Sequence, residues 1–343
     1  MSDSFLELDS LTKSFDGAVA VGNVSLRVPR GTVLALLGPS GSGKTTMLRL
    51  LAGFEQPDSG RVLVDGSDVT ALPPVERRFG MVFQHYALFP HLNVEENVAF
   101  GLTDVSREKR AERVAEVLSL VDMDGYADRE VTALSGGQQQ RVAVARALAP
   151  KPRVLLLDEP LSNLDPGLRE RTRRELRSAL VQAGVTTVFV THEQEEAFAL
   201  GDRIAVLNDG LLEQVGSARS LYEEPESVFV ATFVGRASTL SGIKTAGGEV
   251  RIAESVSWNA EVPEDLGEGA PVTVVVRPEA VSFTDGPGLE GSVTECRYTG
   301  ARAFFTVSAG NLSVELEAPV DSASVGDTVR ITASRVRCFR EES

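Results

Sequence analysis

Five short motifs follow one another along the 343-residue chain, and each has residues suited to binding or activating a phosphate group. In chain order they are the run 38–45 (GPSGSGKT), Gln84, the run 134–138 (LSGGQ), the run 154–159 (VLLLDE) and His192. The first and third motifs are both glycine-rich phosphate contacts, and a single nucleotide site needs only one of them. The sequence therefore predicts a nucleotide enclosed between two copies of this chain, or between the chain and a partner.

The first motif lies between an apolar run, 33–37 (VLALL), and a segment with helical spacing. This strand–loop–helix context distinguishes a phosphate-binding loop from a chance match. Glycines let successive backbone N–H groups point at phosphate oxygens, and the start of the helix adds a positive dipole. We expect Lys44 to reach the β- and γ-phosphates and Thr45 to ligate Mg²⁺. The predicted nucleotide-binding residues are Gly38, Pro39, Ser40, Gly41, Ser42, Gly43, Lys44, Thr45 and Thr46.

Two carboxylates, Asp158 and Glu159, end the apolar run 154–157. Charged groups at the end of a buried strand cost desolvation free energy unless something compensates for it. Mg²⁺ would compensate Asp158, directly or through water. Glu159 is then free to polarise the attacking water. Solvated charges at a strand end are the alternative, and the phosphate-binding loop in the same chain argues against it.

The run 135–138 (SGGQ) opens a predicted helix with a hydroxyl group and two glycines. These residues predict a second anion-binding helix start. Taken alone, Ser135 is explained equally well as an ordinary N-cap, because serine is a favoured capping residue. Both interpretations stay open for this motif by itself.

The spacing of apolar residues divides the chain into two predicted domains. Continuous apolar runs are typical of strands buried in a mostly parallel sheet, and they occur at 33–37, 154–157, 187–190 and 204–207. From about 88 to 150 the spacing becomes helical, which predicts a helical insert. Past Phe233, short alternating runs between turn residues predict a small all-β barrel. We place the domains at 1–235 and 236–343, with the helical subdomain at about 88–150.

Composition excludes several classes of protein. The formal net charge of −15 argues against electrostatic docking on nucleic acid or anionic lipid. Two cysteines are too few for a disulfide framework, and three histidines form no metal-site pattern. The N-terminus lacks the features of a signal peptide, and no apolar stretch is long enough to span a bilayer. We expect a cytoplasmic protein.

The motifs together resemble the nucleotide-binding subunit of ATP-binding cassette (ABC) transporters over residues 5 to about 233. In that family they are called Walker A (38–45), the Q-loop (Gln84), the signature (134–138), Walker B (154–159), the D-loop (162–165) and the switch histidine (His192). The resemblance implies an α/β P-loop NTPase domain with an inserted helical subdomain, and an ATPase that binds ATP and Mg²⁺. It also implies a head-to-tail dimer, with itself or with a paralogous cassette. Walker A of one subunit and the signature of the other would then enclose each ATP.

The resemblance also implies roles for single residues. His192 would contact the γ-phosphate, and Phe15 would stack on adenine, although Phe15 is also a candidate for the core. The implied catalytic residues are Glu159, His192 and Gln84. Further ATP contacts would come from Ser135, Gly136, Gly137, Gln138 and Asp165. The implied Mg²⁺ ligands are Thr45, Gln84 and Asp158.

The tail resembles the TOBE domain, an OB-like barrel appended to many importer ATPases, through the run 275–279 (VVRPE). The tail is acidic and lacks a basic groove, which predicts a regulatory or dimer-bracing role and no nucleic-acid binding. The resemblance implies an importer subunit, peripheral on the cytoplasmic face of the inner membrane. Its permease would dock near 84–91, where Tyr86 and Phe89 are expected to be exposed or to form an apolar cluster. An extracytoplasmic solute-binding protein would be an indirect partner.

The transported solute is not encoded in these motifs. The runs 82–89 (VFQHYALF) and 35–38 (ALLG) look most like those of sulfate-type importers, so we favour sulfate or another small inorganic ion. Polyamine, iron and sugar importers share nearly as much. Soluble ABC ATPases of DNA repair or translation are a second class, but the coiled-coil insertion, zinc motif or tandem cassettes usual there are absent. Intact Lys44, Asp158, Glu159 and His192 argue against a non-hydrolysing regulator.

Overall fold

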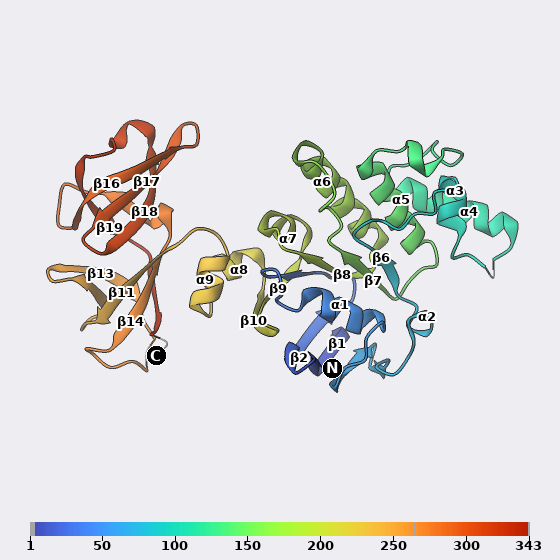
Figure 1. Cartoon of the computed structure of the whole chain (residues 1–343), viewed down its shortest axis with the longest axis horizontal. Helices are drawn as coiled ribbons and strands as arrows, with labels where there is room; N and C mark the ends of the chain where they lie inside the picture. The colour runs from blue at the N-terminus through green and yellow to red at the C-terminus, as the bar shows by residue number, and fades with distance from the viewer. Residues whose placement is uncertain (1–3, 104, 264, 342–343) are drawn as a thin grey trace. The chain divides into compact units, whose positions relative to one another are not determined.

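The computed structural model describes residues 4–103, 105–263 and 265–341 (Figure 1). Contacts between Cα atoms divide the chain into two compact units, Met1–Ser220 and Leu221–Ser343. This division falls ahead of the domain boundary expected near Gly235, which stays a prediction. The fold class predicted from the sequence is confirmed: an α/β P-loop unit with a helical insert is followed by an all-β unit.

The central sheet of the first unit has the strand order β10-β9-β3-β8-β7-β6. All neighbouring pairs are parallel except β10 with β9. Its strands are β3 (Val33–Leu37), β6 (Gly80–Val82), β7 (Val154–Asp158), β8 (Thr186–Thr191), β9 (Arg203–Asn208) and β10 (Leu211–Gly216). The apolar runs are buried because both faces of the sheet are covered.

An antiparallel sheet of order β2-β1-β4-β5 belongs to the same unit. It contains β1 (Ser4–Phe15), β2 (Ala18–Pro29), β4 (Ser59–Val64) and β5 (Ser67–Asp68). Apolar residues of this sheet, of helix α1 (Lys44–Ala52) and of the central sheet form one buried cluster. The buried Arg77 of α2 (Pro74–Arg77) donates to the carbonyls of Leu50 and Leu51 and so fixes the end of α1.

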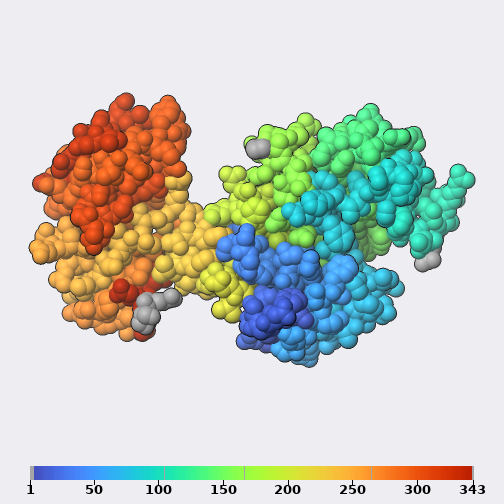
Figure 2. All heavy atoms as spheres, viewed as in Figure 1, coloured from blue at the N-terminus to red at the C-terminus, as the bar shows by residue number. Residues whose placement is uncertain are grey.

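Helices fill the chain between β6 and β7, where the sequence predicts an insert. They are α3 (Val94–Ala99), α4 (Arg107–Leu120), η1 (Val131–Ala133) and α5 (Gly136–Leu148). The cyan and green residues of this region form one lobe of the first unit in the space-filling view (Figure 2). Helices α6 (Pro166–Ala183) and α7 (Gln194–Leu200) follow β7 and β8. Among the described residues, no helix has the length and apolar character needed to cross a bilayer.

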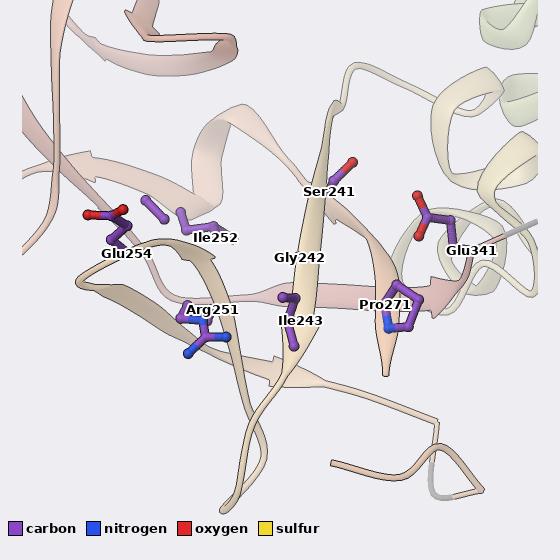
Figure 3. A pocket seen from close by; sticks show the side chains of 9 residues that line it. Ser241, Gly242, Ile243, Arg251, Ile252, Glu254, Pro271 and Glu341 are labelled. Carbon is purple, nitrogen blue, oxygen red and sulfur yellow. The ribbon is translucent and has the colours of Figure 1, made fainter. Parts of the chain in front are cut away.

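The second unit contains two β modules over one apolar cluster, where the sequence predicted a single small barrel. The closed barrel consists of β11 (Ser238–Lys244), β12 (Glu249–Ala253), β13 (Val256–Glu261), β20 (Val336–Arg340) and β14 (Pro271–Val276). The sheet beside it consists of β15 (Val281–Phe283), β19 (Thr328–Ala333), β16 (Leu289–Tyr298), β17 (Arg302–Ala309) and β18 (Leu312–Pro319). Short helical turns η2 (Pro278–Ala280) and η3 (Val320–Ser322) join strands. A pocket of about 530 Å³ on the barrel carries Arg251, Glu254 and Glu341 among its lining residues (Figure 3).

Side chains near the run 275–279 explain why the second unit begins before Gly235. The helices α8 (Ala218–Glu223) and α9 (Val228–Phe233) precede the barrel. The hydroxyl of Tyr222 donates to Glu279 at 2.6 Å, and Arg277 lies over the Tyr222 ring and donates to its carbonyl. Burial and then the bond to Glu279 raise the pKa of Tyr222 to about 12, so the phenol stays protonated.

Thiol reactivity tests the packing of the second unit. Cys296 is exposed on β16, whereas Cys338 is buried in the barrel, where burial raises its thiol pKa to about 11. Because the thiolate is the reactive form, iodoacetamide at pH 8 should modify one cysteine per native chain and two per denatured chain. Mass spectrometry of tryptic peptides identifies the site. Native labelling of a Cys296→Ser variant at the wild-type rate would contradict this fold.

Candidate nucleotide-binding and hydrolysis site

The phosphate-binding loop joins the buried strand β3 to helix α1 through glycines that admit no side chain. Gly43, the N-cap of α1, has a φ of 91°, and a Cβ there would lie 2.1 Å from the carbonyl oxygen of Ala20. A Cβ on Gly38 would lie 2.2 Å from the carbonyl oxygen of Leu207. No side chain in the described part of the chain caps α1. The first N–H groups of this helix are therefore available to an anion.

Lys44 is 6% exposed and folds back over the loop. Its Nζ donates to the carbonyls of Gly38 at 2.9 Å and Pro39 at 2.7 Å, and to Ser42 Oγ at 3.2 Å. Burial lowers the pKa of the ammonium, and the charge of Glu159 opposes that shift. A buried ammonium held only by neutral oxygens is suited to exchanging them for phosphate oxygens.

Asp158 and Glu159 are adjacent carboxylates at the carboxyl end of β7. Burial, followed by the neighbouring charge of Glu159, raises the pKa of Asp158, and Arg49 opposes the shift. Such a pair favours a cation between them and a phosphate. The hydroxyl of Thr45 and the carboxylate of Asp158 are hard oxygen donors of the kind that Mg²⁺ prefers, so these residues fit that ion.

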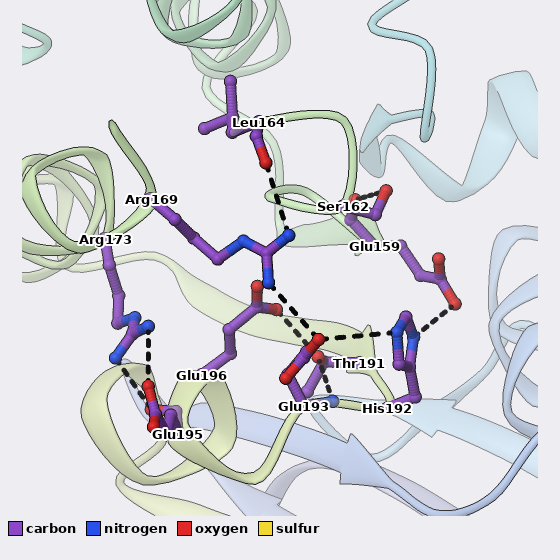
Figure 4. A network of polar contacts seen from close by, with 10 residues as sticks. All are labelled: Glu159, Ser162, Leu164, Arg169, Arg173, Thr191, His192, Glu193, Glu195 and Glu196. Carbon is purple, nitrogen blue, oxygen red and sulfur yellow. Dashed lines mark hydrogen bonds and ion pairs between the residues drawn. The ribbon is translucent and has the colours of Figure 1, made fainter. Parts of the chain in front are cut away.

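Glu159 also has a left-handed backbone, with a φ of 44°, which is uncommon outside glycine. Its side chain receives contacts from two neighbouring strands. Gln84 Nε2 donates to Glu159 Oε2 at 3.0 Å, and His192 Nδ1 lies 3.3 Å from Glu159 Oε1 (Figure 4). Strands β6, β7 and β8 are parallel neighbours, so the residues that follow their carboxyl ends meet at one edge of the sheet.

The D-loop lies against the same group. Asn163 Nδ2 donates to the carbonyl of Gln84 and lies 3.2 Å from His85 Nδ1. Ser162 Oγ donates to the carbonyl of Glu159 at 3.0 Å. The carboxylate of Asp165, expected at the nucleotide, accepts a bond from the backbone N–H of Leu168 and caps α6.

The signature residues are engaged within the helical insert. Ser135 Oγ accepts from Gln138 N at 3.4 Å, and Gln138 Oε1 accepts from Ser135 N at 3.0 Å, which makes a capping box at the start of α5. Gln138 Nε2 also contacts the Tyr126 hydroxyl at 3.2 Å. The N-cap interpretation of Ser135 is therefore realised within this chain. The hydroxyl hydrogen of Ser135 is not used by the box and stays available as a donor.

Phe15, expected either on adenine or in the core, is 43% exposed at the end of β1. Lys13 Nζ lies 5.2 Å from the centroid of its ring. A surface aromatic beside a lysine does not belong to the core, so the structure leaves the ring accessible to a base.

The expectation that Tyr86 is exposed is wrong, because its side chain is only 5% exposed. The loop turns back through left-handed backbone at Tyr86 and Ala87, and Arg146 donates to the carbonyls of both residues. Phe89 is half-buried, with its ring centroid 4.3 Å from that of Phe100. The exposed aromatics nearby are residues that the sequence analysis missed: Phe54, Phe83 and Phe100.

Comparison with known families matches both parts of the chain. Residues 21–162 match the family model for ABC transporters, and residues 274–340 match that for the TOBE domain. The spermidine/putrescine import ATP-binding protein PotA of Lawsonia intracellularis is 45% identical, over 86% of this chain and 84% of its own length. The sulfate/thiosulfate import ATP-binding protein CysA of Xanthomonas campestris is 44% identical, over 97% of this chain and 99% of its own length.

Solved structures agree on the first unit. The ABC transporter component cbiO1 from Clostridium perfringens has a TM-score of 0.61 and 29% identity, covering 66% of this chain and 93% of its own. The bacterial cassette MJ0796, solved as a dimer, has a TM-score of 0.54 and 35% identity, covering 62% of this chain and 98% of its own. The chain belongs to the ABC transporter family. Within it, the chain is an importer-type ATP-binding subunit with a TOBE domain, and it is an ATPase.

Glu196, on α7 behind His192, is a buried carboxyl group that the sequence analysis missed. It is 2% exposed; its Oε2 accepts a bond from Thr191 Oγ1 at 2.7 Å, and its Oε1 has no partner among the described residues. Burial raises its pKa above the usual 4.5, while the Thr191 bond and the charge of Arg169 oppose this shift. The folded state therefore favours protonation of Glu196 more than the unfolded state does.

A Glu196→Gln variant tests this burial. A raised folded pKa stabilises the fold fully below the unfolded pKa, and that contribution is lost as pH rises through the folded pKa. Glutamine does not ionise, so the variant's stability relative to wild type should increase as the pH rises from 4.5 through the folded pKa, by at most about 1.4 kcal/mol per pH unit. Urea unfolding at several pH values measures it. A difference that is constant or falls with pH would contradict the assignment.

Proposed function

We propose that this subunit energises import of sulfate or another small inorganic ion. The observation that carries the proposal is the share of each chain that the alignment with its relatives covers. The sulfate/thiosulfate relatives from Xanthomonas campestris and Chromobacterium violaceum match 97% of this chain and 99% and 97% of their own lengths. The polyamine relatives match 86–87% of this chain and 83–85% of theirs, at similar identity. The alignment with the sulfate/thiosulfate relatives extends over nearly the whole chain, so its tail included, and this supports a sulfate-type importer.

The proposed catalytic unit is a pair of cassettes, either two copies of this chain or the chain with a paralogous cassette. Walker A of one subunit and the signature of the other hold each ATP. The uncapped start of α1 and the free hydroxyl hydrogen of Ser135 support this arrangement, because each offers donors to phosphate oxygens. The relative MJ0796 has been solved as a dimer and in a post-hydrolysis state with ADP and Pi.

Roles follow from the cluster at the edge of the sheet. Thr45, Asp158 and Gln84 would hold Mg²⁺, which supplies neutralisation of phosphate charge when bound. Glu159 accepts a proton from the attacking water, since Gln84 and His192 already orient its carboxylate. His192 donates to the γ-phosphate. ATP binding closes the pair of cassettes, and hydrolysis reopens it.

The remaining proposed partners are the other components of a membrane importer. We place the subunit on the cytoplasmic face of the inner membrane, bound to permease subunits near residues 84–91, with an extracytoplasmic solute-binding protein as indirect partner. The exposed rings of Phe83 and Phe54, whose centroids are 6.3 Å apart, extend this surface and support docking of an apolar helix. The regulatory or dimer-bracing role of the tail stays a prediction.

Uptake by a deletion strain tests the proposed solute. Wild-type chain supplied from a plasmid should restore uptake of labelled sulfate and growth on sulfate as sole sulfur source. A Lys44→Ala variant should restore neither, because the ammonium that meets the phosphates is gone. Restored uptake of labelled putrescine or ferric ion, with sulfate uptake unchanged, would assign the subunit to those importers instead.

A Glu159→Gln variant tests the catalytic assignment. It should bind ATP, accumulate as a closed dimer in size-exclusion chromatography with ATP, and lose about 10²–10³-fold in ATPase rate. Glu170→Gln, an exposed carboxylate on α6, is the control and should hydrolyse at the wild-type rate. Hydrolysis by Glu159→Gln at that same rate would remove Glu159 from the reaction.

A further inference from the structure

Arg169 on α6 joins the D-loop to the segment that carries His192. Its Nη2 donates to the carbonyl of Leu164 at 3.3 Å, and its Nη1 donates to Glu193 Oε1 at the same distance. Figure 4 shows the guanidinium between the carbonyl of Leu164 and the carboxylate of Glu193. The same carboxylate also faces the imidazole of His192. A planar fork with two donor nitrogens makes both contacts at once, which a lysine cannot do.

The imidazole of His192 lies between two carboxylates. Its Nδ1 is 3.3 Å from Glu159 Oε1, and its Nε2 is 3.8 Å from Glu193 Oε1. The side chain of His192 is 48% exposed, so packing alone does not fix the ring. The Nε2–Oε1 distance of 3.8 Å is longer than a hydrogen bond and becomes an ion pair when the imidazole is protonated. The carboxylate that faces the ring there is held by Arg169.

These contacts close a circuit around the hydrolysis site. From His192 the circuit runs through Glu159 to Gln84. It continues through Asn163, which donates to the Gln84 carbonyl, into the D-loop and along it to Leu164. From there Arg169 and Glu193 return it to His192. Without Arg169, the connection from the D-loop to the histidine among the polar contacts of the described residues would run through Glu159 and Gln84.

We infer that Arg169 and Glu193 are positioning residues for ATP hydrolysis. They hold the D-loop and His192 in one fixed arrangement, and a displacement of the D-loop reaches the histidine through this pair. The inference rests on the proposed role of His192. Neither side chain is assigned a contact with nucleotide, so their loss changes turnover and leaves ATP affinity unchanged.

The chain provides a matched control one turn further along α6. Arg173 forms the same kind of ion pair with a glutamate of α7, Glu195, at 3.4 Å. Its guanidinium also donates to the carbonyl of that residue. This pair contacts neither the D-loop nor His192 in the described structure. Arg173→Met therefore removes an arginine of the same helix and an ion pair to a nearby glutamate without interrupting the circuit.

The experiment compares ATPase kinetics of the full-length chain carrying Arg169→Met, Glu193→Gln, both changes together, or Arg173→Met. We expect Arg169→Met and Glu193→Gln each to lower kcat by about tenfold to hundredfold, as misplacement of a catalytic group does. KM and the affinity for a fluorescent ATP analogue should stay within twofold of wild type. The double variant should be no slower than the slower single one, because both changes break one connection. Arg173→Met should retain wild-type kcat.

Three outcomes would overturn the inference: equal kcat for Arg169→Met and Arg173→Met, additive losses in the double variant, or losses in affinity as large as those in kcat. Arg169→Lys and Glu193→Gln keep the test valid if Arg169→Met does not fold, since lysine keeps the charge but not the fork. Glu159→Gln separates the two levels of the argument. If it lowers kcat by about 10²–10³-fold while Arg169→Met keeps the wild-type kcat, the positioning role fails and the proposed function stands. If it hydrolyses normally, the proposed function fails.

Discussion

The rest of this structure depends on holding charged groups partly buried at the edge of a parallel sheet, where burial outweighs the opposing charges of the protein. Asp158 and Glu159 are adjacent at the end of β7, and burial raises the pKa of Asp158. Lys44 is buried among carbonyl oxygens, and burial lowers its pKa. Burial disfavours the charged forms of Asp158 and Lys44, and in the proposed site a bound cation and a phosphate would offset this cost. The fold supplies the rigidity that keeps them in place: α1 is anchored at its end by Arg77, and β3 is buried on both faces.

The N-termini of helices α1 and α5 differ in their capping, and this difference decides which of them leaves backbone N–H groups unpaired. Helix α1 begins at Gly43, where no side chain of the described residues caps it, while α5 begins with a complete capping box of Ser135 and Gln138. The first helix start leaves its N–H groups for an anion. The second pairs two of its N–H groups with its own side chains and offers one hydroxyl hydrogen. In the proposed pair of cassettes, a nucleotide bound at the first helix start of one subunit would meet the second helix start of the other.

Local sequence patterns predicted much of this arrangement, because a buried strand, a glycine loop and a carboxylate at a strand end each have a short-range signature. The runs 33–37 and 154–157 became β3 and β7, and Gln84, Glu159 and His192 follow adjacent strands. Contacts between residues far apart in the sequence depend on strand order and on the conformations of long side chains. Short sequence patterns do not predict these contacts. Examples are the burial of Tyr86 by a left-handed turn, the second β module of the tail, and the pairing of Arg169 with Glu193 across 24 residues.

The ion pair between Arg169 and Glu193 contributes little to the stability of the fold. Its side chains are 24% and 43% exposed, and an ion pair at such a place contributes about 0–1 kcal/mol to stability. The pair contributes little to stability, yet the guanidinium contacts the carbonyl of Leu164 and the carboxylate of Glu193 at the same time. Stability therefore does not explain the placement of an arginine there. The geometry does, because it makes the position of the histidine depend on the position of the D-loop.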